Sequence, residues 1–444
     1  MIRISALTYP GKSPWIIHIL LLSLALHLFV ISFPSDGGKV FDEVSYVQAS
    51  LDFMAGKASN LEHSFLGKAW AGFSIAVFGN SWFAWRIPSV LFGLFSIFVF
   101  YCLARIFLNE YEALCASAFL SFENVFFTHS SLLMLDVPPL FFGILGIFLY
   151  CKGRYWSSAA VLSLSFLCKE WGIMFAAIVA VDSIMQNGRN LTAKSLRRGV
   201  IFLLIYLGGI FLAMWAYDLI YKPVGQMQVA QDTVNVYENG NVAKKERQGT
   251  ENLPIRNPVD HLRYMRNYHS SLVMKDHEWI DAWNNVPWGW ISPFYVKAPI
   301  YFQTTLTRNI TLSSSDQKVE SVTKITHPIT WTGMGNLCIW LSIWLVAPFC
   351  VFRILTRRSV HLDYLILFWI IFTYLPWFYV SLVMKRIVYS YYFINTVPAL
   401  CLGIPHLIAC LAPSDKTKKA VLAIWLAATI GFFFYFFPVN VFAE

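Results

Sequence analysis

The sequence predicts an all-α protein that crosses a membrane many times, and three observations support this. Hydrophobic residues make up 57% of the 444 residues, and the mean hydropathy is +0.55. Charged residues make up only 13%, whereas roughly a quarter of the residues in soluble domains are charged. Apolar runs of roughly 20 residues, the length that a membrane helix needs, recur along the chain. We therefore expect a bundle of membrane helices.

Eleven apolar runs qualify as membrane spans. A run of about 17 to 25 mostly apolar residues can cross the hydrocarbon core. The predicted spans are 15–33, 82–107, 112–128, 131–150, 155–170, 172–186, 198–220, 333–353, 361–381, 387–411 and 419–438. No small-residue cleavage site follows the first run, so we interpret it as a retained helix and not as a signal peptide.

Basic residues gather in every second loop between these runs. With a cytoplasmic N-terminus, the basic residues of the inner loops are Lys152, Arg154, Arg189, Lys194, Arg197, Arg357, Arg358, Lys416 and Lys418. This is the positive-inside pattern. It predicts an N-terminal transmembrane module (1–220) with a first outer loop at 34–81, an outer segment (221–330) and C-terminal transmembrane helices (331–444).

The outer segment 221–330 changes character along its length. Its first half is rich in Asn, Gln and Lys, and its second half, 261–301, is dense in aromatic residues. We expect an interfacial helix around 258–274, followed by an aromatic cover that lies against the membrane.

Two adjacent carboxylates, Asp42 and Glu43, follow the first span where the chain enters the outer loop. Charge at a membrane boundary is costly, so an acid pair there indicates a functional site. A second interpretation is a surface helix that Asp42 caps and whose first turn Glu43 stabilises. From these residues alone, both interpretations stay open.

Other charged residues are placed on the same outer side. They are His63, Lys68, Arg86, His129, Asp136, Lys169, Glu170, Lys385 and Arg386. Any one of them could be a solvated loop charge or a side chain that reaches to the interface. Together they favour a site, because cations can hold a phosphate and a carboxylate can take a proton from a hydroxyl group. This combination suits the transfer of a sugar from a lipid phosphate carrier.

Several segments, in this order, resemble the dolichyl-phosphate-mannose–protein O-mannosyltransferases. They are Phe41-Asp42-Glu43 followed by His63 and Leu66-Gly67-Lys68, then Arg86-Ile87-Pro88-Ser89, then Asn267-Tyr268-His269 with Trp288 and Trp290, then His327-Pro328-Ile329-Thr330-Trp331, and finally Tyr374-Leu375-Pro376-Trp377 through Tyr391-Tyr392. The chain departs from the family where Ser64-Phe65 replaces a proline pair. Its outer segment is also too short for the β-trefoil module of the fungal and animal enzymes.

The resemblance implies a GT-C fold with eleven transmembrane helices and a catalytic face outside the cytoplasm. It implies an inverting transfer of mannose from a polyprenyl (dolichyl) phosphate to Ser or Thr hydroxyls of proteins. Asp42 is then the catalytic base, and Glu43 orients its neighbours or the acceptor. The residues expected to bind the lipid phosphate and sugar are Lys68, Arg86, Asp136, Lys169, Lys385, Arg386 and Tyr392, and those expected to bind the acceptor are His63, Tyr268 and His269.

The expected partners are the polyprenyl phosphate sugar donor, an acceptor protein and membrane lipid, without nucleic acid. The missing β-trefoil favours a prokaryotic cell membrane over the endoplasmic reticulum. No cofactor or metal site is predicted. A divalent cation on the acid pair stays open as an alternative, but no third carboxylate stands at ligand spacing to support it. Two alternatives are a sister GT-C enzyme that modifies a lipid or glycan, and a transporter, whose midplane site and internal repeats are not visible in the sequence.

Overall fold

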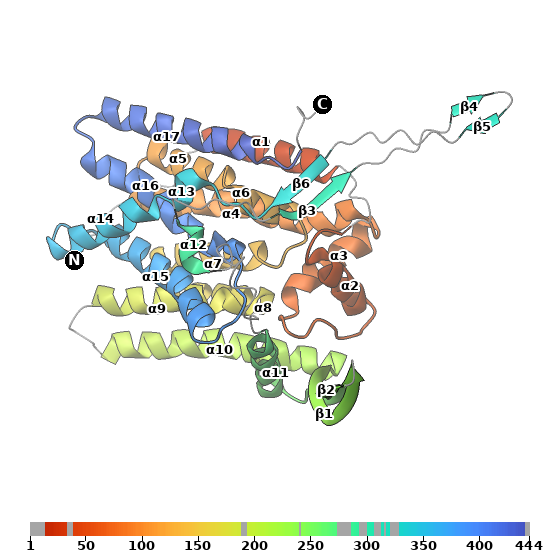
Figure 1. Cartoon of the computed structure of the whole chain (residues 1–444). Helices are drawn as coiled ribbons and strands as arrows, with labels where there is room; N and C mark the ends of the chain where they lie inside the picture. Colours follow the sequence, from red (N-terminus) through yellow and green to blue (C-terminus); the bar gives the residue numbers. More distant parts are fainter. Residues whose placement is uncertain are drawn as a thin grey trace.

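The computed structural model describes residues 14–32, 39–187, 193–238, 241–272, 286–292, 300–305, 312–314, 317–319 and 328–439. In this part of the chain, long helices lie side by side in one bundle, and antiparallel two-stranded sheets lie at or beyond one end (Figure 1). The predicted membrane-embedded helical fold is therefore confirmed.

The N-terminal half of the bundle contains most of the helices that frame the site. They are α1 (Trp15–Ile31), α2 (Glu43–Met54), α3 (Leu66–Phe78), α4 (Trp82–Phe107), α5 (Glu110–Ser121), α6 (Asn124–Ser131), α7 (Val137–Cys151), α8 (Tyr155–Cys168), η1 (Glu170–Gly172), α9 (Ile173–Asn187) and α10 (Ala193–Tyr221).

The predicted outer segment combines helices with hairpins. Its elements are β1 (Val224–Glu238), β2 (Asn241–Pro254), α11 (Pro258–Ser271), α12 (Pro287–Trp290), β3 (Ile300–Thr305), β4 (Leu312–Ser314), β5 (Gln317–Val319) and β6 (Pro328–Thr332). The expected interfacial helix is present as α11, which Asn257 caps through hydrogen bonds from two backbone amides. The β1–β2 hairpin was not predicted, although Asn-Gly, the dipeptide between its strands, favours two-residue hairpin turns.

The C-terminal helices complete the bundle. They are α13 (Leu337–Trp340), α14 (Ile343–Leu355), α15 (His361–Leu382), η4 (Ser390–Asn395), α16 (Val397–Leu411) and α17 (Asp415–Tyr435).

The third predicted span, 112–128, is broken into α5 and α6 at a buried carboxylate. Glu123 accepts hydrogen bonds from the backbone amides of Phe126 at 2.6 Å and Asn336 at 3.0 Å, and from the indole of Trp340 at 3.0 Å. At the start of α6, the Phe126 amide has no partner within the helix, and Glu123 supplies one. The break is therefore stable inside the bundle.

By length and composition, five of the described helices can cross a membrane. They are Trp82–Phe107, Leu196–Tyr221, Leu337–Leu355, His361–Leu382 and Asp415–Tyr435. Shorter apolar helices lie among them, and helix occupies part of every predicted span within the described residues. The count of eleven crossings stays a prediction.

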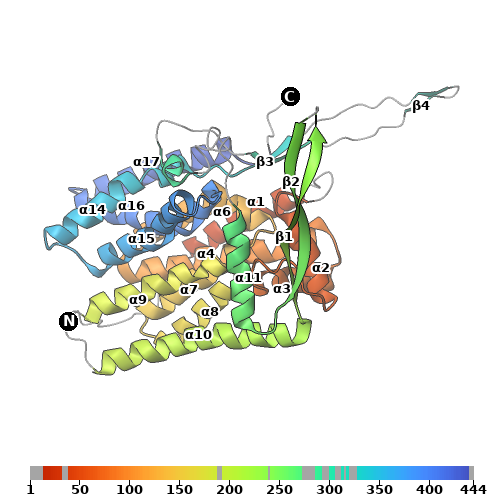
Figure 2. The ribbon, with the colours of Figure 1, turned by 60° about the horizontal axis from the view of Figure 1, so that its bottom comes forward.

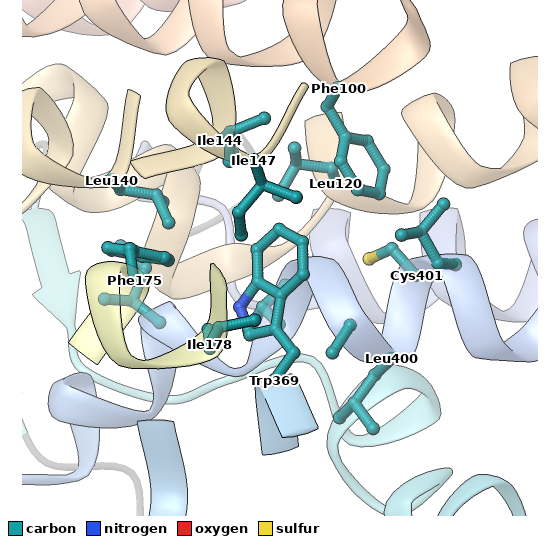
Figure 3. Close-up of a cluster of buried hydrophobic side chains, with 14 of the residues drawn as sticks. Phe100, Leu120, Leu140, Ile144, Ile147, Phe175, Ile178, Trp369, Leu400 and Cys401 are labelled. Carbon is teal, nitrogen blue, oxygen red and sulfur yellow. The ribbon is translucent and has the colours of Figure 1, made fainter. Parts of the chain in front are cut away.

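The core joins the N-terminal and C-terminal helices around Trp369 of α15. Figure 3 shows its indole among side chains from α4, α5, α7, α9 and α16. The indole nitrogen donates a hydrogen bond to the carbonyl of Asn395 at 2.8 Å. Gly143 lets α7 approach α9 closely, because a Cβ there would lie 2.3 Å from the Phe175 ring. Close helix packing of this kind replaces the hydrophobic effect as the main attraction between helices in lipid.

One end of the bundle gathers the elements of the predicted first outer loop and outer segment. The α2 and α3 helices lie there, and α11 with the β1–β2 hairpin crosses the direction of the long helices (Figure 2). We call this the hairpin end. It brings together residues that are far apart in the sequence.

Candidate functional site

The acid pair splits into a buried and a partly exposed carboxylate. Glu43 is fully buried and forms an ion pair with Arg86 of α4, at 2.8 and 2.9 Å. Its oxygens also accept hydrogen bonds from the backbone amides of Val40 at 2.9 Å and Leu133 at 2.8 Å. Glu43 therefore ties α2, α4 and the α6–α7 turn together, and its oxygens are occupied by protein donors.

Asp42 precedes α2 without capping it, since its side chain makes no capping hydrogen bond. Among the described residues, its carboxylate accepts one hydrogen bond, from the Tyr46 hydroxyl at 3.3 Å. Burial raises the pKa of Asp42, and the nearby Lys169 opposes this rise while Asp136 adds to it. The capping interpretation is therefore not supported by the structure, and the carboxylate keeps acceptor capacity for a substrate.

A buried network at the start of α7 faces Asp42. Asp136 accepts a hydrogen bond from the Lys169 ammonium at 2.9 Å, and its other oxygen lies 3.2 Å from His129 Nδ1. The Lys169 ammonium also lies 5.9 Å from the centre of the Tyr391 ring. All four side chains are almost fully buried. This arrangement fixes a positive charge beside Asp42, inside the protein where charges interact strongly.

Lys169 and Glu170 point to different partners because the chain is extended at Lys169, with φ −159° and ψ 138°. Glu170 lies between two histidines: its Oε2 is 3.1 Å from His63 Nδ1, and its Oε1 is 3.1 Å from His269 Nε2. We call His63, Glu170 and His269 the histidine–glutamate cluster. From the sequence, Glu170 was grouped with the other outer charges, and no role was predicted for it.

A cavity of about 330 Å³ opens beside these groups. Its lining residues are His63, Phe166, Lys169, Glu170, Trp171, Ile173, His269, Trp377, Arg386 and Tyr392. Tyr392 stacks on Trp377 with ring centres 4.3 Å apart. Five predicted site residues thus line one cavity: His63, Lys169, His269, Arg386 and Tyr392. They come from the loop before α3, the α8–η1 turn, α11 and the segment after α15.

Arg386 and Lys385 separate at a strained turn. Lys385 has φ +50°, in the left-handed region that non-glycine residues seldom adopt, and its side chain is exposed. Arg386 is partly buried and lines the cavity, and among the described residues its Nε has no hydrogen-bond partner. Arg386 is thus available to a ligand in the cavity, whereas Lys385 is not among the lining residues.

Two predicted phosphate-binding cations are used otherwise. The Lys68 ammonium donates hydrogen bonds to the carbonyls of Ser59, Asn60 and His63, at 2.5 to 3.3 Å. Arg86 is paired with Glu43 and is 1% exposed. Protein acceptors already hold both side chains, so the structure does not support the expected direct contacts with phosphate. Lys68 instead holds the first outer loop together, and Arg86 fixes α2 through Glu43.

Of four charged residues that the sequence assigns to the site, Arg386 lines this cavity, whereas Asp42, Arg86 and Asp136 do not. Asp136 lies near Asp42, since its charge adds to the rise of the Asp42 pKa, but neither residue lines the cavity. Tyr268 precedes His269 on α11, and burial raises the pKa of its hydroxyl, which lies near Arg386 and Asp42. Of the expected aromatic cover, α11 and α12 are described, and 273–285 and 293–299 lie outside the described residues.

Residues 62–217 match the family model of the dolichyl-phosphate-mannose-protein mannosyltransferases. No curated protein sequence matches the chain. Among solved structures, the S. cerevisiae protein O-mannosyltransferase Pmt1-Pmt2 complex bound to the sugar donor aligns with a TM-score of 0.71 and 11% identity, over 96% of this chain and 89% of that one.

Two further structures share the fold. ArnT from Cupriavidus metallidurans bound to undecaprenyl phosphate aligns with a TM-score of 0.55 and 12% identity, over 94% of this chain and 64% of that one. The Archaeoglobus fulgidus oligosaccharyltransferase aligns with a TM-score of 0.53 and 11% identity, over 96% of this chain and 56% of that one. The family match supports the predicted resemblance over residues 62–217, and the likeness to these structures confirms the predicted GT-C fold.

Proposed function

We propose that this protein transfers mannose from a polyprenyl-phosphate-linked donor to Ser or Thr hydroxyls of a protein acceptor, with inversion at the anomeric carbon. The observation that carries the proposal is the pairing of a carboxylate with spare acceptor capacity, Asp42, with cations on a neighbouring cavity wall. The mannosyltransferase family match over residues 62–217 and the fold of the donor-bound Pmt1-Pmt2 complex also support it.

In the proposed reaction, the acceptor oxygen attacks the anomeric carbon of mannose as the carbon–oxygen bond to the phosphate breaks. Asp42 takes the hydroxyl proton, because a hydroxyl group is a weak nucleophile at neutral pH. The electron pair of the broken bond stays on the lipid phosphate. A single displacement of this kind inverts the anomeric carbon.

Lys169 and Arg386 would hold the donor phosphate and stabilise the charge that develops on it. Both line the cavity, and cationic groups placed before the reaction lower the energy of such a charge. Asp136 would not contact the substrate in this scheme; it positions Lys169 through the 2.9 Å ion pair. The stacked Tyr392 and Trp377 supply an apolar wall beside these cations.

The hairpin end would face the outside of a prokaryotic cell membrane. The positive charges of the predicted inner loops support this orientation. Tyr268, on α11 at the same end, would meet an acceptor arriving from outside.

A second candidate is a sister enzyme that transfers the sugar to a lipid or glycan, and the fold shared with ArnT bound to undecaprenyl phosphate favours it. Purified protein, incubated with radiolabelled polyprenyl-phosphate mannose, a Ser/Thr-containing peptide and lipid acceptors, separates the two. We expect label in the peptide. Label in lipid alone would support the second candidate, and no release of sugar from the carrier would contradict both.

A further inference from the structure

The histidine–glutamate cluster brings together three side chains from separate segments at the cavity wall. His63 precedes α3, Glu170 begins η1 and His269 lies in the last turn of α11. Their side-chain exposures are 13%, 26% and 13%, so the cluster is sheltered but reachable from the cavity. The functional scheme above leaves Glu170 without a task.

The three groups form a ligand set that suits a transition-metal ion. One nitrogen from each imidazole and one carboxylate oxygen lie within 4.8 Å of one another. A tetrahedral ion with bonds of about 2.0 to 2.2 Å holds neighbouring ligand atoms roughly 3.3 Å apart. Each imidazole nitrogen lies 3.1 Å from one oxygen of Glu170, Oε2 for His63 and Oε1 for His269, which is near that spacing for whichever oxygen is the ligand.

A further oxygen converges on the same place. The backbone carbonyl of Glu62 lies 3.1 Å from His269 Nε2, the nitrogen that also faces the Glu170 carboxylate. In a zinc-bound state the Glu170 oxygen would be the ligand, and the Glu62 carbonyl would lie beside the three-residue ligand set without belonging to it. The electron-rich atoms around Nε2 therefore favour a cation.

The loop that carries His63 is fixed from two sides. Lys68 donates a hydrogen bond to the His63 carbonyl at 2.9 Å. On the other side, His261 of α11 contacts the Leu61 carbonyl at 3.3 Å and Asp218 at 2.8 Å. These contacts hold the backbone of the loop in place around His63.

We propose that His63, Glu170 and His269 bind a zinc ion. Two histidines and one carboxylate are a zinc ligand set that leaves a fourth position open, as in catalytic zinc sites. Here that position faces the cavity shared with Lys169 and Arg386. There the ion would hold a phosphate oxygen and supply positive charge beside the phosphate leaving group; this last step rests on the proposed function.

Metal binding is tested without reference to catalysis. Full-length protein in detergent is stripped with a chelator, desalted and titrated with Co²⁺, whose visible absorption reports tetrahedral coordination. In parallel, Zn²⁺ is added and desalted away, and the bound zinc is measured by mass spectrometry. We expect one ion per chain in the wild type, and at least about tenfold weaker binding in Glu170→Gln, which loses a ligand but keeps the size of the side chain.

His361→Ala is the matched control. His361 pairs with Asp182 at 2.9 Å, so this change also removes a histidine from a carboxylate pair, but from a pair outside the histidine–glutamate cluster. It should keep full zinc binding. His269→Ala provides a second cluster variant, and size-exclusion chromatography shows which variants are folded.

The outcomes separate the site from the activity. Wild-type zinc content equal to that of folded Glu170→Gln would overturn the metal site and leave a hydrogen-bonded cluster. A change of the Co²⁺ spectrum on adding inorganic phosphate would support an open coordination position, and an unchanged spectrum would contradict it. Zinc binding without any sugar transfer would remove the proposed function alone, whereas full transfer by metal-free protein would remove the proposed role of the ion.

Discussion

Replacing Asp42 with asparagine tests the central step of the proposed reaction. A positioned general base contributes about 10²- to 10⁴-fold to the rate, which is about 2.7 to 5.5 kcal/mol of barrier at about 1.36 kcal/mol for each factor of ten. We expect Asp42→Asn to lose that much turnover because the amide cannot take the hydroxyl proton.

The structure indicates that this variant should fold. Asp42 makes no capping hydrogen bond, and its one described hydrogen bond, from Tyr46, is 3.3 Å long. An asparagine oxygen can still accept that bond, and an average hydrogen bond contributes only about 0.5 to 1.5 kcal/mol. The stability of Asp42→Asn should therefore stay near that of the wild type, so a loss of turnover would not come from unfolding.

Transfer of labelled mannose to a Ser/Thr peptide by purified protein measures the effect. Tyr46→Phe is the matched control, because it removes the same hydrogen bond and leaves the carboxylate in place. We expect Tyr46→Phe to retain most of the turnover. Near-normal turnover in Asp42→Asn, or an equal loss in both variants, would refute the assignment of Asp42 as the base.

Three further predictions follow from the same contacts. Because burial raises the pKa of Asp42 and the base must be ionised, kcat/KM should fall as the pH drops through a value above the ordinary aspartate pKa of about 3.9; a profile flat down to that value, or one unchanged in Asp42→Asn, would contradict this. Arg386→Gln should raise the KM for the donor about 10- to 100-fold, since a hydrogen bond to a charged group contributes about 1.5 to 3 kcal/mol. Lys385→Gln is the control, because this exposed side chain lies one position earlier and should not affect the KM. Equal effects in both variants would contradict a role of Arg386 in donor binding. Arg86→Met should reduce stability by about 3 to 5 kcal/mol, because it leaves Glu43 charged and buried without its partner; thermal melting in detergent measures this, and an unchanged melting temperature would contradict the structural role of the pair.

Most of the fold followed from apolar length and charge, because these two properties determine where a chain can cross lipid. The predicted spans coincide in part with helix throughout the described residues. The break between α5 and α6 could not be predicted, since Glu123 is stable there only through donors such as Asn336, which lies more than two hundred residues later in the chain. The β1–β2 hairpin was missed because the polar composition of its strands hid their alternation.

The sequence predicted that the charged residues of the site share one side of the membrane, but it did not predict the partner of each charged residue. The sequence placed Lys68, Arg86 and Arg386 on one side with equal standing, but only Arg386 reaches the cavity. The difference comes from acceptors that sequence spacing does not reveal: the loop carbonyls that surround Lys68 and the carboxylate that meets Arg86. A buried cation is stable only when such acceptors surround it, so burial decides which cations remain for a ligand.

In the adjacent pairs Asp42-Glu43 and Lys169-Glu170, the two side chains point in different directions, although the backbone is helical in the first pair and extended in the second. Asp42 and Glu43 stand at the start of a helix, where neighbours point in different directions, and one is sealed inside while the other stays reachable. Lys169 is extended, so it and Glu170 also diverge, toward Asp136 and toward the two histidines. In both pairs, one residue is buried against protein partners, and its neighbour is the more exposed of the two. We infer that reversing the order of the first pair, Asp42→Glu with Glu43→Asp, should weaken the Arg86 contact and displace the base together, so that stability and turnover fall in the same variant.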